Sequence, residues 1–410
     1  MMLFKNYLLA ILVLFSFALL GQSGKNFNIR TITAGVTIAD LSDTATVIQA
    51  VEFLKHSRKV YTEAGYTVQT IRISTQHLHE YLNENTYNQA LPFLRKFDRI
   101  AKRDNIMFSI GNLLPPDQYD DKIADWVVRL IGETENISFS LPISSSQLGI
   151  HTNSIKASAE IAVAVSKNSK GGEGNFRFTA SANCPPGSPF FPAAFHQGPN
   201  SFAIGTESPN ILTEVFKSSD WNNAAENLKT ELERNFQPLE EIAEQISKDT
   251  KWEYDGIDTS PAPGLDASIG DAIEALTGQP FGGASTLSAC ALITGVIKSL
   301  EIKTCGYSGL MLPVIEDRTL AKRAMENRYS VQEILLFSSV SGTGLDVVPI
   351  PGNTSLRTIE RIYTDVASLS LKYTNKALSA RLFLIPGKNV GDKVEFDNPY
   401  LTTATVMKIE

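Results

Sequence analysis

Apolar and polar positions change along the first half of the chain with a rhythm that predicts repeated strand–helix units. Short apolar or alternating runs, which are typical of strands, exchange with longer runs of helical spacing. The first helix is expected to stop at Gly65, since glycine commonly ends helices. This order is typical of a parallel sheet covered by helices. The predicted strands are 28–36, 67–74, 106–111 and 137–143, and the helices that follow them are 44–64, 87–103, 118–131 and 155–165.

The second half of the chain has a less regular pattern. Two predicted strands, 176–182 and 201–206, bracket a proline-rich loop, and a long charged helix follows. Segments rich in glycine and proline at 256–264 and 341–353 are interpreted as loops. The remaining predicted helices are 221–248, 265–276, 286–300, 318–327 and 356–373, and the remaining strands are 310–315, 381–385 and 393–396.

The proline-rich loop is the most informative part of the sequence, which reads FRFTASANCPPGSPFFPAA over residues 176–194. Its prolines restrict φ along the turn, so Asn183, Cys184 and Ser188 are expected to be held in a fixed geometry. Long rigid loops after strands tend to be functional. We therefore predict that this loop forms one wall of a concave site, with Arg177 beneath it and Asp258 opposite.

The first 23 residues have the pattern of a secretory signal peptide. Lys5 precedes an apolar run at residues 8–20 that is too short to span a bilayer, and small residues follow it. A buried N-terminal helix is the alternative. No cysteine follows the apolar run, so no stable membrane anchor is expected after cleavage. We predict a periplasmic or secreted protein with a single domain at residues 24–410.

Composition limits the classes of partner and of fold. The formal net charge is −7 and no cluster of Lys and Arg occurs, which argues against nucleic acid as a partner. With 43% apolar and 20% charged residues, the chain can bury a sizeable core. Its three cysteines, Cys184, Cys290 and Cys305, cannot all pair within one chain. Oligomeric state and cofactors stay open at this stage.

Several familiar catalytic motifs are missing from the sequence. Gly342-x-Gly344 lacks the third glycine of a dinucleotide-binding fingerprint, and no phosphate-binding GxxxxGK[ST] loop occurs. The spacing around Ser308 does not match the nucleophile elbow of hydrolases, and all five histidines lie before residue 197. His196, which ends the proline loop, is the histidine best placed for a site.

Acidic residues on predicted loops are candidates for a cleft. Glu207 ends a predicted strand, Asp255 and Asp258 flank a turn, and Asp346 follows a glycine loop. Such carboxylates could bind a hard divalent cation or act as acid and base. Turn formation is the alternative, because Asp favours turns through its own hydrogen bonds. We favour the turn for Asp255 and the site for Asp258.

Several separate segments resemble the uncharacterised protein family DUF711, also called UPF0210. They are NIRTITAG, FRFTASANCPPGSPFFPAAFH, DGIDTSPAP, FGGASTLSA, CGYSGLMLPVIED and SGTGLDVVPIPG, in that order along almost the whole chain after residue 23. The resemblance implies a large α/β barrel similar to that of glycyl-radical enzymes such as pyruvate formate-lyase, in a family without an assigned reaction. Members of the family are usually cytosolic, so the leader is a departure.

The similarity to glycyl-radical enzymes directs attention to KTCGY at residues 303–307. Those enzymes carry a similar Gly-Tyr segment near the C-terminus, whereas this one lies about a hundred residues before the end. A glycyl radical would also need an iron–sulfur activase and anoxic conditions. Export of the protein argues against both. We therefore interpret the segment as a tight turn.

We expect an enzyme that acts on a small polar or anionic molecule in a cleft at the carboxyl ends of the strands, by an unknown reaction. A non-catalytic binding protein with the same cleft is the alternative. Arg72 and Arg177 could equally be outward-facing charges on strands. The sequence does not indicate whether a metal ion is bound. The candidate catalytic residues are Cys184, Glu207, His196 and Asp258, and the candidate substrate-binding residues are Arg30, Arg72, Arg177, Asn183, Ser188 and Tyr307.

Overall fold

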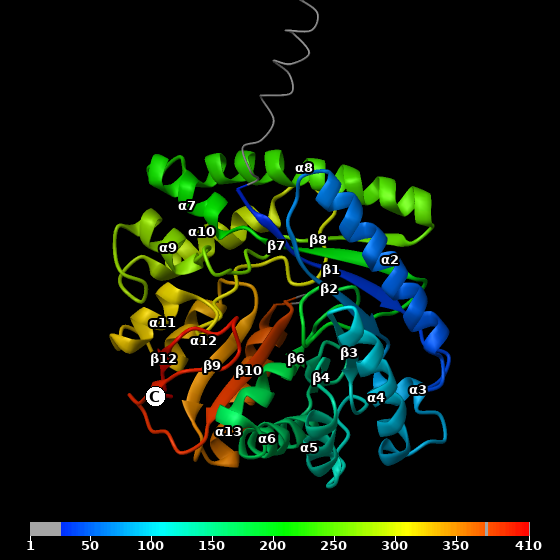
Figure 1. The fold of residues 1–410 in the computed structure, drawn as a ribbon. Coiled ribbons are helices and arrows are strands. Elements are labelled where there is room, and N and C mark those ends of the chain that lie inside the picture. Colours follow the sequence, from blue (N-terminus) through cyan, green and yellow to red (C-terminus); the bar gives the residue numbers. More distant parts are fainter. Residues whose placement is uncertain (1–25, 374–375, 410) are drawn as a thin grey trace, which may run out of the picture.

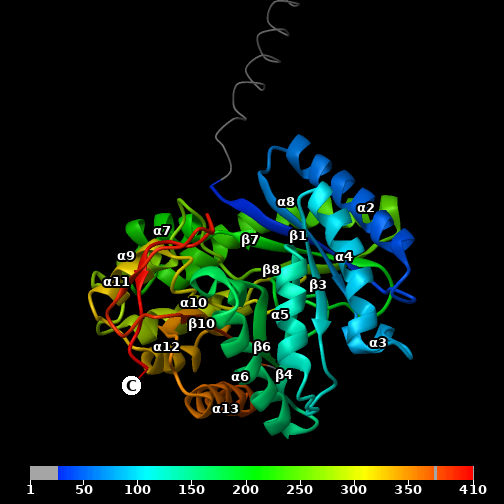
Figure 2. The same ribbon diagram turned by 60° about the horizontal axis from the view of Figure 1, so that its bottom comes forward.

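The computed structural model describes residues 26–373 and 376–409, so the predicted leader at residues 1–23 lies outside the described residues. One large sheet of ten strands forms the centre of the molecule, and helices surround it on the outside (Figure 1). Figure 2 shows the same arrangement from another side, with α4 close to β3 and α6 close to β4. The predicted α/β class is therefore confirmed.

Five parallel strands form the middle of the sheet, in the order β1-β2-β3-β4-β6. Each helix between them covers the outer face of the sheet, as expected for right-handed strand–helix units. The strands are β1 (Asn28–Val36), β2 (Val68–Thr75), β3 (Ile106–Asn112), β4 (Ile137–Ser145) and β6 (Phe178–Ala182). The helices are α2 (Thr44–Glu63), α3 (Leu78–Tyr81), α4 (Tyr87–Arg103), α5 (Ile123–Glu133), α6 (Thr152–Lys167) and the 3-10 helix η1 (Lys170–Arg177).

A parallel pair of strands flanks this block on each side, running antiparallel to it. β7 (Ser201–Glu207) lies beside β1 and is followed by β8 (Glu253–Asp258), whereas β10 (Leu378–Ile385) lies beside β6 and is followed by β9 (Gly344–Pro351). Short pairings add β5 (Gly149–Ile150) to β4 and join β11 (Lys393–Val394) to β12 (Ala404–Thr405).

The edge strands β8 and β9 are not hydrogen-bonded to each other in the sheet order. The segment at residues 304–313 lies between them and makes one isolated bridge to each edge. Thr304 pairs with Ile257 of β8, and Pro313 pairs with Asp346 of β9. The described residues thus form a large rolled sheet that strand pairing does not close.

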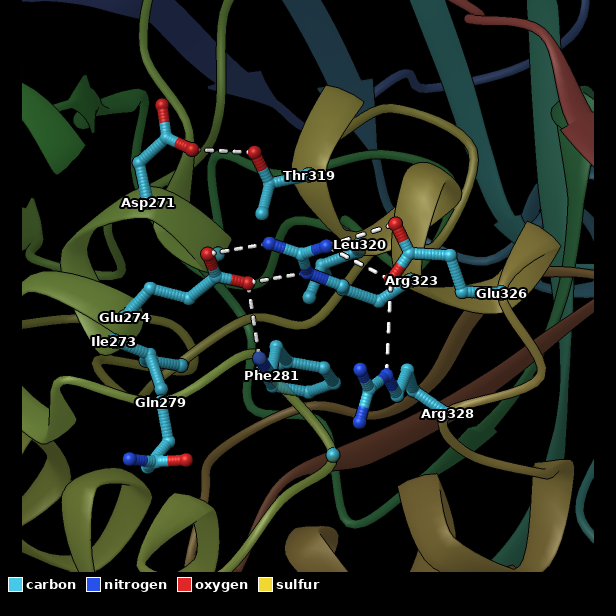
Figure 3. Close-up of polar contacts among 12 residues, drawn as sticks. Asp271, Ile273, Glu274, Gln279, Phe281, Thr319, Leu320, Arg323, Glu326 and Arg328 are labelled. Carbon is cyan, nitrogen blue, oxygen red and sulfur yellow. Dashed lines mark hydrogen bonds and ion pairs between the residues drawn. The ribbon is translucent and has the colours of Figure 1, made fainter.

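The helices of the second half pack around the edge pairs. Arg323 of α11 joins α11 to α9 through Glu274, with Nε–Oε1 and Nη2–Oε2 distances of 2.6 and 2.8 Å (Figure 3). Glu274 also accepts the Phe281 N–H, which fixes the loop after α9. These helices are α7 (Pro209–Ser218), α8 (Ala224–Thr250), α9 (Ile269–Thr277), α10 (Thr286–Lys298), α11 (Arg318–Met325), α12 (Val331–Ser338) and α13 (Leu356–Lys372).

Several predictions for the second half are wrong. The predicted strand at 310–315 is buried, but it makes only the isolated bridge at Pro313. The predicted loop at 341–353 contains β9, whose prolines suggested a loop. An edge strand tolerates proline because one side of its backbone needs no ladder partner. The predicted loop from residue 256 likewise overlaps the end of β8, and α7 and α12 were not predicted.

None of the helices in the described ranges has the length and apolar character needed to cross a membrane. The outer faces of the strands and the inner faces of the helices form one contiguous apolar core. On β2, for example, Ile71 and Ile73 lie in this core, whereas Arg72 between them points to the other side of the sheet. The inner side of the rolled sheet is therefore the polar side, where a site can form.

Candidate functional site

The proline loop fills part of the inner side of the sheet. Its backbone is hydrogen-bonded to three strands, since the His196 N–H donates to Thr75 O, Thr33 Oγ1 to Pro189 O and Ser109 Oγ to Ala194 O, at 2.7–2.9 Å. Because Thr75 ends β2, the loop covers the inner side near the carboxyl ends of the parallel strands. The tip of the loop then points toward their amino ends.

A cavity of about 510 Å³ lies beyond the loop tip. The parallel strands contribute residues from their amino-terminal halves, such as Arg30, Gln69 and Ser138, Asn136 lies just before β4, and the loop contributes Phe190 and Phe191. The expectation of a cleft at the carboxyl ends of these strands is therefore wrong for this cavity, because the loop occupies that space. Pro263 lies after β8 and Glu316 lies after the segment at residues 304–313, and the C-terminal segment Asp397, Asn398, Pro399 and Tyr400 completes the lining.

Two of the three strand arginines in the cavity are fully ion-paired. Arg30 contacts Glu207 and Glu316 at 3.2 Å each, through Nη1 and Nη2. Arg381 Nη2 contacts Glu316 Oε1 at 2.8 Å and Asp346 Oδ1 at 2.7 Å. Glu316 thus bridges the two arginines, and burial-driven desolvation of these groups is offset by a continuous chain of opposite charges. Protein carboxylates therefore neutralise both guanidinium groups, and neither group is available to pair with a ligand.

Arg72 is different, because it has no carboxylate partner among the described residues. Its Nε donates a long hydrogen bond of 3.3 Å to Thr70 Oγ1, and its guanidinium lies 5.1 Å from the centre of the Phe191 ring. The side chain is as buried as the paired arginines, at 7% exposure. Burial lowers the pKa of Arg72 to about 9; the charges of Arg30 and Arg381 add to this effect, and Glu316 and Tyr400 oppose it without forming an ion pair with Arg72. At neutral pH Arg72 still carries a positive charge, and that charge is buried and unpaired.

Several neutral polar groups in the same cavity also lack partners. Gln69 Oε1, Asn136 Nδ2, Ser138 Oγ and Thr343 Oγ1 are buried without a hydrogen bond to any described residue, and all four residues line the cavity. Buried polar atoms are normally hydrogen-bonded. Their number in one cavity therefore indicates a polar occupant, which could accept or donate hydrogen bonds to these groups.

The cavity also has an apolar wall. Phe176, Phe190, Phe191 and Met311 line it, while Tyr307 reaches it from the turn after Cys305. A cavity that combines apolar surface with a few placed polar groups is typical of small-molecule sites. The arrangement is suited to a molecule with an acidic group, some hydrogen-bonding groups and an apolar body.

Of the predicted substrate-binding residues, Arg30, Arg72, Arg177 and Tyr307 line the cavity, and Asn183 and Ser188 do not. Arg177 is engaged elsewhere. Its guanidinium donates to the carbonyls of Ile131, Thr134 and Ile137 at 2.6–3.3 Å. These carbonyls lie at the end of α5 and the start of β4, so Arg177 caps the C-terminal end of the helix.

Asn183 is likewise engaged in local structure. Its Oδ1 accepts the Ser146 N–H and its Nδ2 donates to Ser370 Oγ, both at 3.0 Å. Ser188 is buried with a hydroxyl that has no partner among the described residues, close to Gly306. The expectation that Asn183, Ser188, Arg177 and Asp258 share one concave pocket is not met by this cavity, which only Arg177 reaches.

The structure does not bring Cys184 and His196 together. Cys184 Sγ contacts Leu378 O at 3.3 Å and Tyr307 Oη at 3.5 Å, and burial raises the pKa of its thiol to about 11. His196 contacts Gly198 O at 2.9 Å and Ser201 Oγ at 3.4 Å, and burial lowers its pKa. Cys184 and His196 are not hydrogen-bonded to each other, so no thiolate–imidazolium pair forms here.

Asp258 and Glu207 do not line the cavity but hold residues that do. Asp258 accepts the N–H groups of Tyr307 and Ser308 at 2.8 and 2.9 Å, and burial raises its pKa. It thereby holds the turn that includes Ser308 at φ 37° and presents Tyr307 to the cavity. Glu207 accepts from Arg30 and from Gln69, so it orients two cavity residues without lining the cavity itself.

Three important cavity residues were not predicted from the sequence as site residues: Glu316, Asp346 and Arg381. Arg381 alternates with apolar neighbours in its strand, and Glu316 follows an apolar run directly, which are the signals that could have identified them. Asp346 was recognised as a loop carboxylate but not placed in the site. No group of three or more His, Cys, Asp or Glu residues suited to a metal ion occurs in the described parts of the chain.

Comparisons with known proteins agree with the resemblance seen in the motifs. A family model described as "Uncharacterised ACR (DUF711)" matches residues 22–398. A protein named "UPF0210 protein" from Halothermothrix orenii is 23% identical, over 94% of this chain and 91% of the relative. A "UPF0210 protein" from Desulforamulus reducens is 24% identical, over 91% and 88%, and "UPF0210 protein CPE1497" from Clostridium perfringens is 23% identical, over 94% and 91%.

Proposed function

The chain belongs to the DUF711 family of uncharacterised proteins, and on that premise we propose that it binds a small organic anion in the interior cavity and is an enzyme acting on that molecule. Arg72 carries the proposal. A buried, unpaired guanidinium is energetically costly in a free protein, and an anionic group on a ligand would remove that cost. Arg72 would supply the charge-assisted hydrogen bonds.

The rest of the cavity supports the same kind of ligand. The unpartnered groups of Gln69, Asn136, Ser138 and Thr343 would meet polar substituents, and the Phe190 and Phe191 rings would meet an apolar body. The volume of about 510 Å³ suits a molecule of metabolite size. A non-catalytic binding protein is the second candidate, because the carboxylates of Glu207 and Glu316 are already held by arginines.

The fold proposal goes with the functional one. We infer that the rolled sheet is an incompletely closed α/β barrel, supported by the bridges of Thr304 and Pro313 to the two edge strands. In that arrangement the proline loop would close one end of the interior. The cavity would then lie at the opposite, open end of the barrel, and the C-terminal segment would partly cover it.

Ligand-induced thermal stabilisation tests the binding proposal. The probes are acetate, benzoate and inorganic phosphate, with benzamide as an uncharged analogue of benzoate. A ligand at about 100 times its Kd stabilises a protein by about 2.7 kcal/mol, so a rise in melting temperature is measurable. We expect benzoate to stabilise the wild type and benzamide to have little effect.

Two matched variants complete the test. Arg72→Met removes the unpaired charge, and Arg361→Met removes an exposed charge on α13. The response to benzoate should disappear in Arg72→Met and persist in Arg361→Met. An equal response of the wild type and Arg72→Met to every probe would refute the proposal.

A further inference from the structure

We propose that binding of an anion at Arg72 is coupled to uptake of one proton by Asp346, at its oxygen Oδ2. The inference rests on the proposed function, since it concerns the same cavity. It goes further by assigning a proton-linked step to Asp346, which is paired with Arg381 and to which the proposed function gives no role. The proton comes from solvent and forms an O–H bond on Oδ2, so no other bond is made or broken.

The geometry of Asp346 leaves one of its oxygens available. Oδ1 accepts from Arg381 Nε at 2.9 Å and from Arg381 Nη2 at 2.7 Å. Oδ2 makes no hydrogen bond with any described residue, yet the side chain is 14% exposed and the residue lines the cavity. A proton on Oδ2 would therefore leave both Arg381 bonds in place.

The other two carboxylates of the network do not have this freedom. Glu316 uses Oε1 for Arg381 and Oε2 for Arg30. Glu207 accepts from Asn28 at Oε1 and from Arg30 at Oε2. A proton on either group would displace a hydrogen bond as well as remove the charge from an ion pair, whereas a proton on Asp346 Oδ2 would only remove the charge from its pair with Arg381. Asp346 is therefore the carboxylate on which a proton costs least.

The charges around Asp346 explain why a proton would be taken up. The groups that face it are Arg381 from β10, Glu316 from the segment after Pro313, Arg30 from β1 and Tyr307 from the turn before that segment. With Arg72 and Glu207 included, the formal charges of three arginines and three carboxylates sum to zero, although Arg72 forms no ion pair with any of the three carboxylates. An anion bound at Arg72 adds one negative charge to a buried, balanced network.

A proton on Asp346 restores the balance. Burial already raises the pKa of Asp346, although Arg381 opposes the shift. An added negative charge nearby raises the pKa of a carboxyl group further, since like charges disfavour ionisation. In the loaded state Asp346 would be a carboxylic acid in the same cavity as the bound anion. This is the state required of a general acid, so the site would suit proton transfer to an anionic substrate.

Isothermal titration calorimetry of the full chain with benzoate measures the proton directly. Titrations in Bis-Tris and in Tris buffer, which differ in ionisation enthalpy and contain no anionic buffer species, give the number of protons taken up per benzoate bound. We expect a value close to one in the wild type and close to zero in Asp346→Asn. Asp365→Asn removes an exposed carboxylate on α13 and should behave as the wild type.

The affinity gives an independent readout. Between about pH 6 and pH 8 benzoate stays ionised, so proton uptake by Asp346 should weaken wild-type binding by up to tenfold per unit rise in pH. The affinity of Asp346→Asn should be independent of pH. Benzoate binding without proton uptake, or uptake that persists in Asp346→Asn, overturns the inference alone. If benzoate and the other acidic probes fail to bind the wild type, the proposed function itself fails.

Discussion

At the scale of single residues, the partner of each arginine decides its role. Arg72 and Arg177 both lie at the cavity, and their positions on strands made both candidates from sequence. Arg177 donates to three backbone carbonyls, whereas Arg72 has only Thr70 Oγ1 and the Phe191 ring. Sequence shows that an arginine alternates with apolar neighbours, but the partner comes from a distant part of the chain. The distinction therefore required the structure.

The first prediction concerns Arg72 in the unliganded protein. Arg72→Met should stabilise the fold by about 1–2 kcal/mol, because an apolar side chain of similar length replaces a buried unpaired charge. Urea unfolding with and without benzoate measures the effect. Arg361→Met should stay within about 0.5 kcal/mol of the wild type. A clear loss of stability in Arg72→Met would mean that the guanidinium is structurally paired after all.

At the scale of elements, the regular strand–helix units were predictable and the edges of the sheet were not. The first four units carry clear periodicity, and all four strands and their helices are observed. β9 was missed because Pro349 and Pro351 suggest a loop, and the strand forms through pairing with β10, about 30 residues further along the chain. The segment at 310–315 has the opposite character, since it is apolar and buried but lacks a ladder.

The second prediction concerns the end of α5. Arg177→Met should destabilise the protein by about 3 kcal/mol, because it leaves the Thr134 and Ile137 carbonyls without their donor in a buried place. The same urea unfolding experiment applies. Arg72→Met and Arg177→Met are therefore expected to change stability in opposite directions, although both remove an arginine from the cavity wall. An Arg177→Met protein of wild-type stability would assign Arg177 to ligand binding instead.

At the scale of the whole molecule, stability should depend on pH through histidines that are buried or half-buried. Burial and the neighbouring His79 lower the pKa of His77 to about 3, and burial lowers the pKa of His196. The unfolded chain binds protons below pH 6.5 while the folded chain resists them. The contribution of neutral His77 to the free energy of unfolding is therefore fully present above pH 6.5 and is lost as the pH falls from 6.5 toward 3.

The third prediction is that the stability of the fold decreases as the pH falls below 6.5. Between pH 6.5 and 5, the free energy of unfolding should fall by up to about 1.4 kcal/mol per pH unit for each such histidine. His77→Gln should have a shallower slope, and His56→Gln, which changes an exposed histidine, should not. Chemical unfolding at a series of pH values provides the measurement. Identical slopes for wild type and His77→Gln would contradict the assignment.

The fourth prediction concerns the start of the chain, which lies outside the described residues. We expect export, with cleavage that places the mature N-terminus near Gly24. Mass spectrometry of the N-terminal peptide from protein recovered outside the cytoplasm checks this. Recovery of the intact leader from that fraction would count against export.

The central claim is that the cavity binds an anion at Arg72, and a crystal soaked with 4-bromobenzoate tests it most directly. Anomalous scattering locates the bromine atom, and the ring and carboxylate can be placed from it. We predict a bromine peak beside the Phe190 and Phe191 rings, with the carboxylate at hydrogen-bonding distance from the Arg72 guanidinium. An empty cavity at Arg72, with bromine peaks only at the protein surface, would contradict the account.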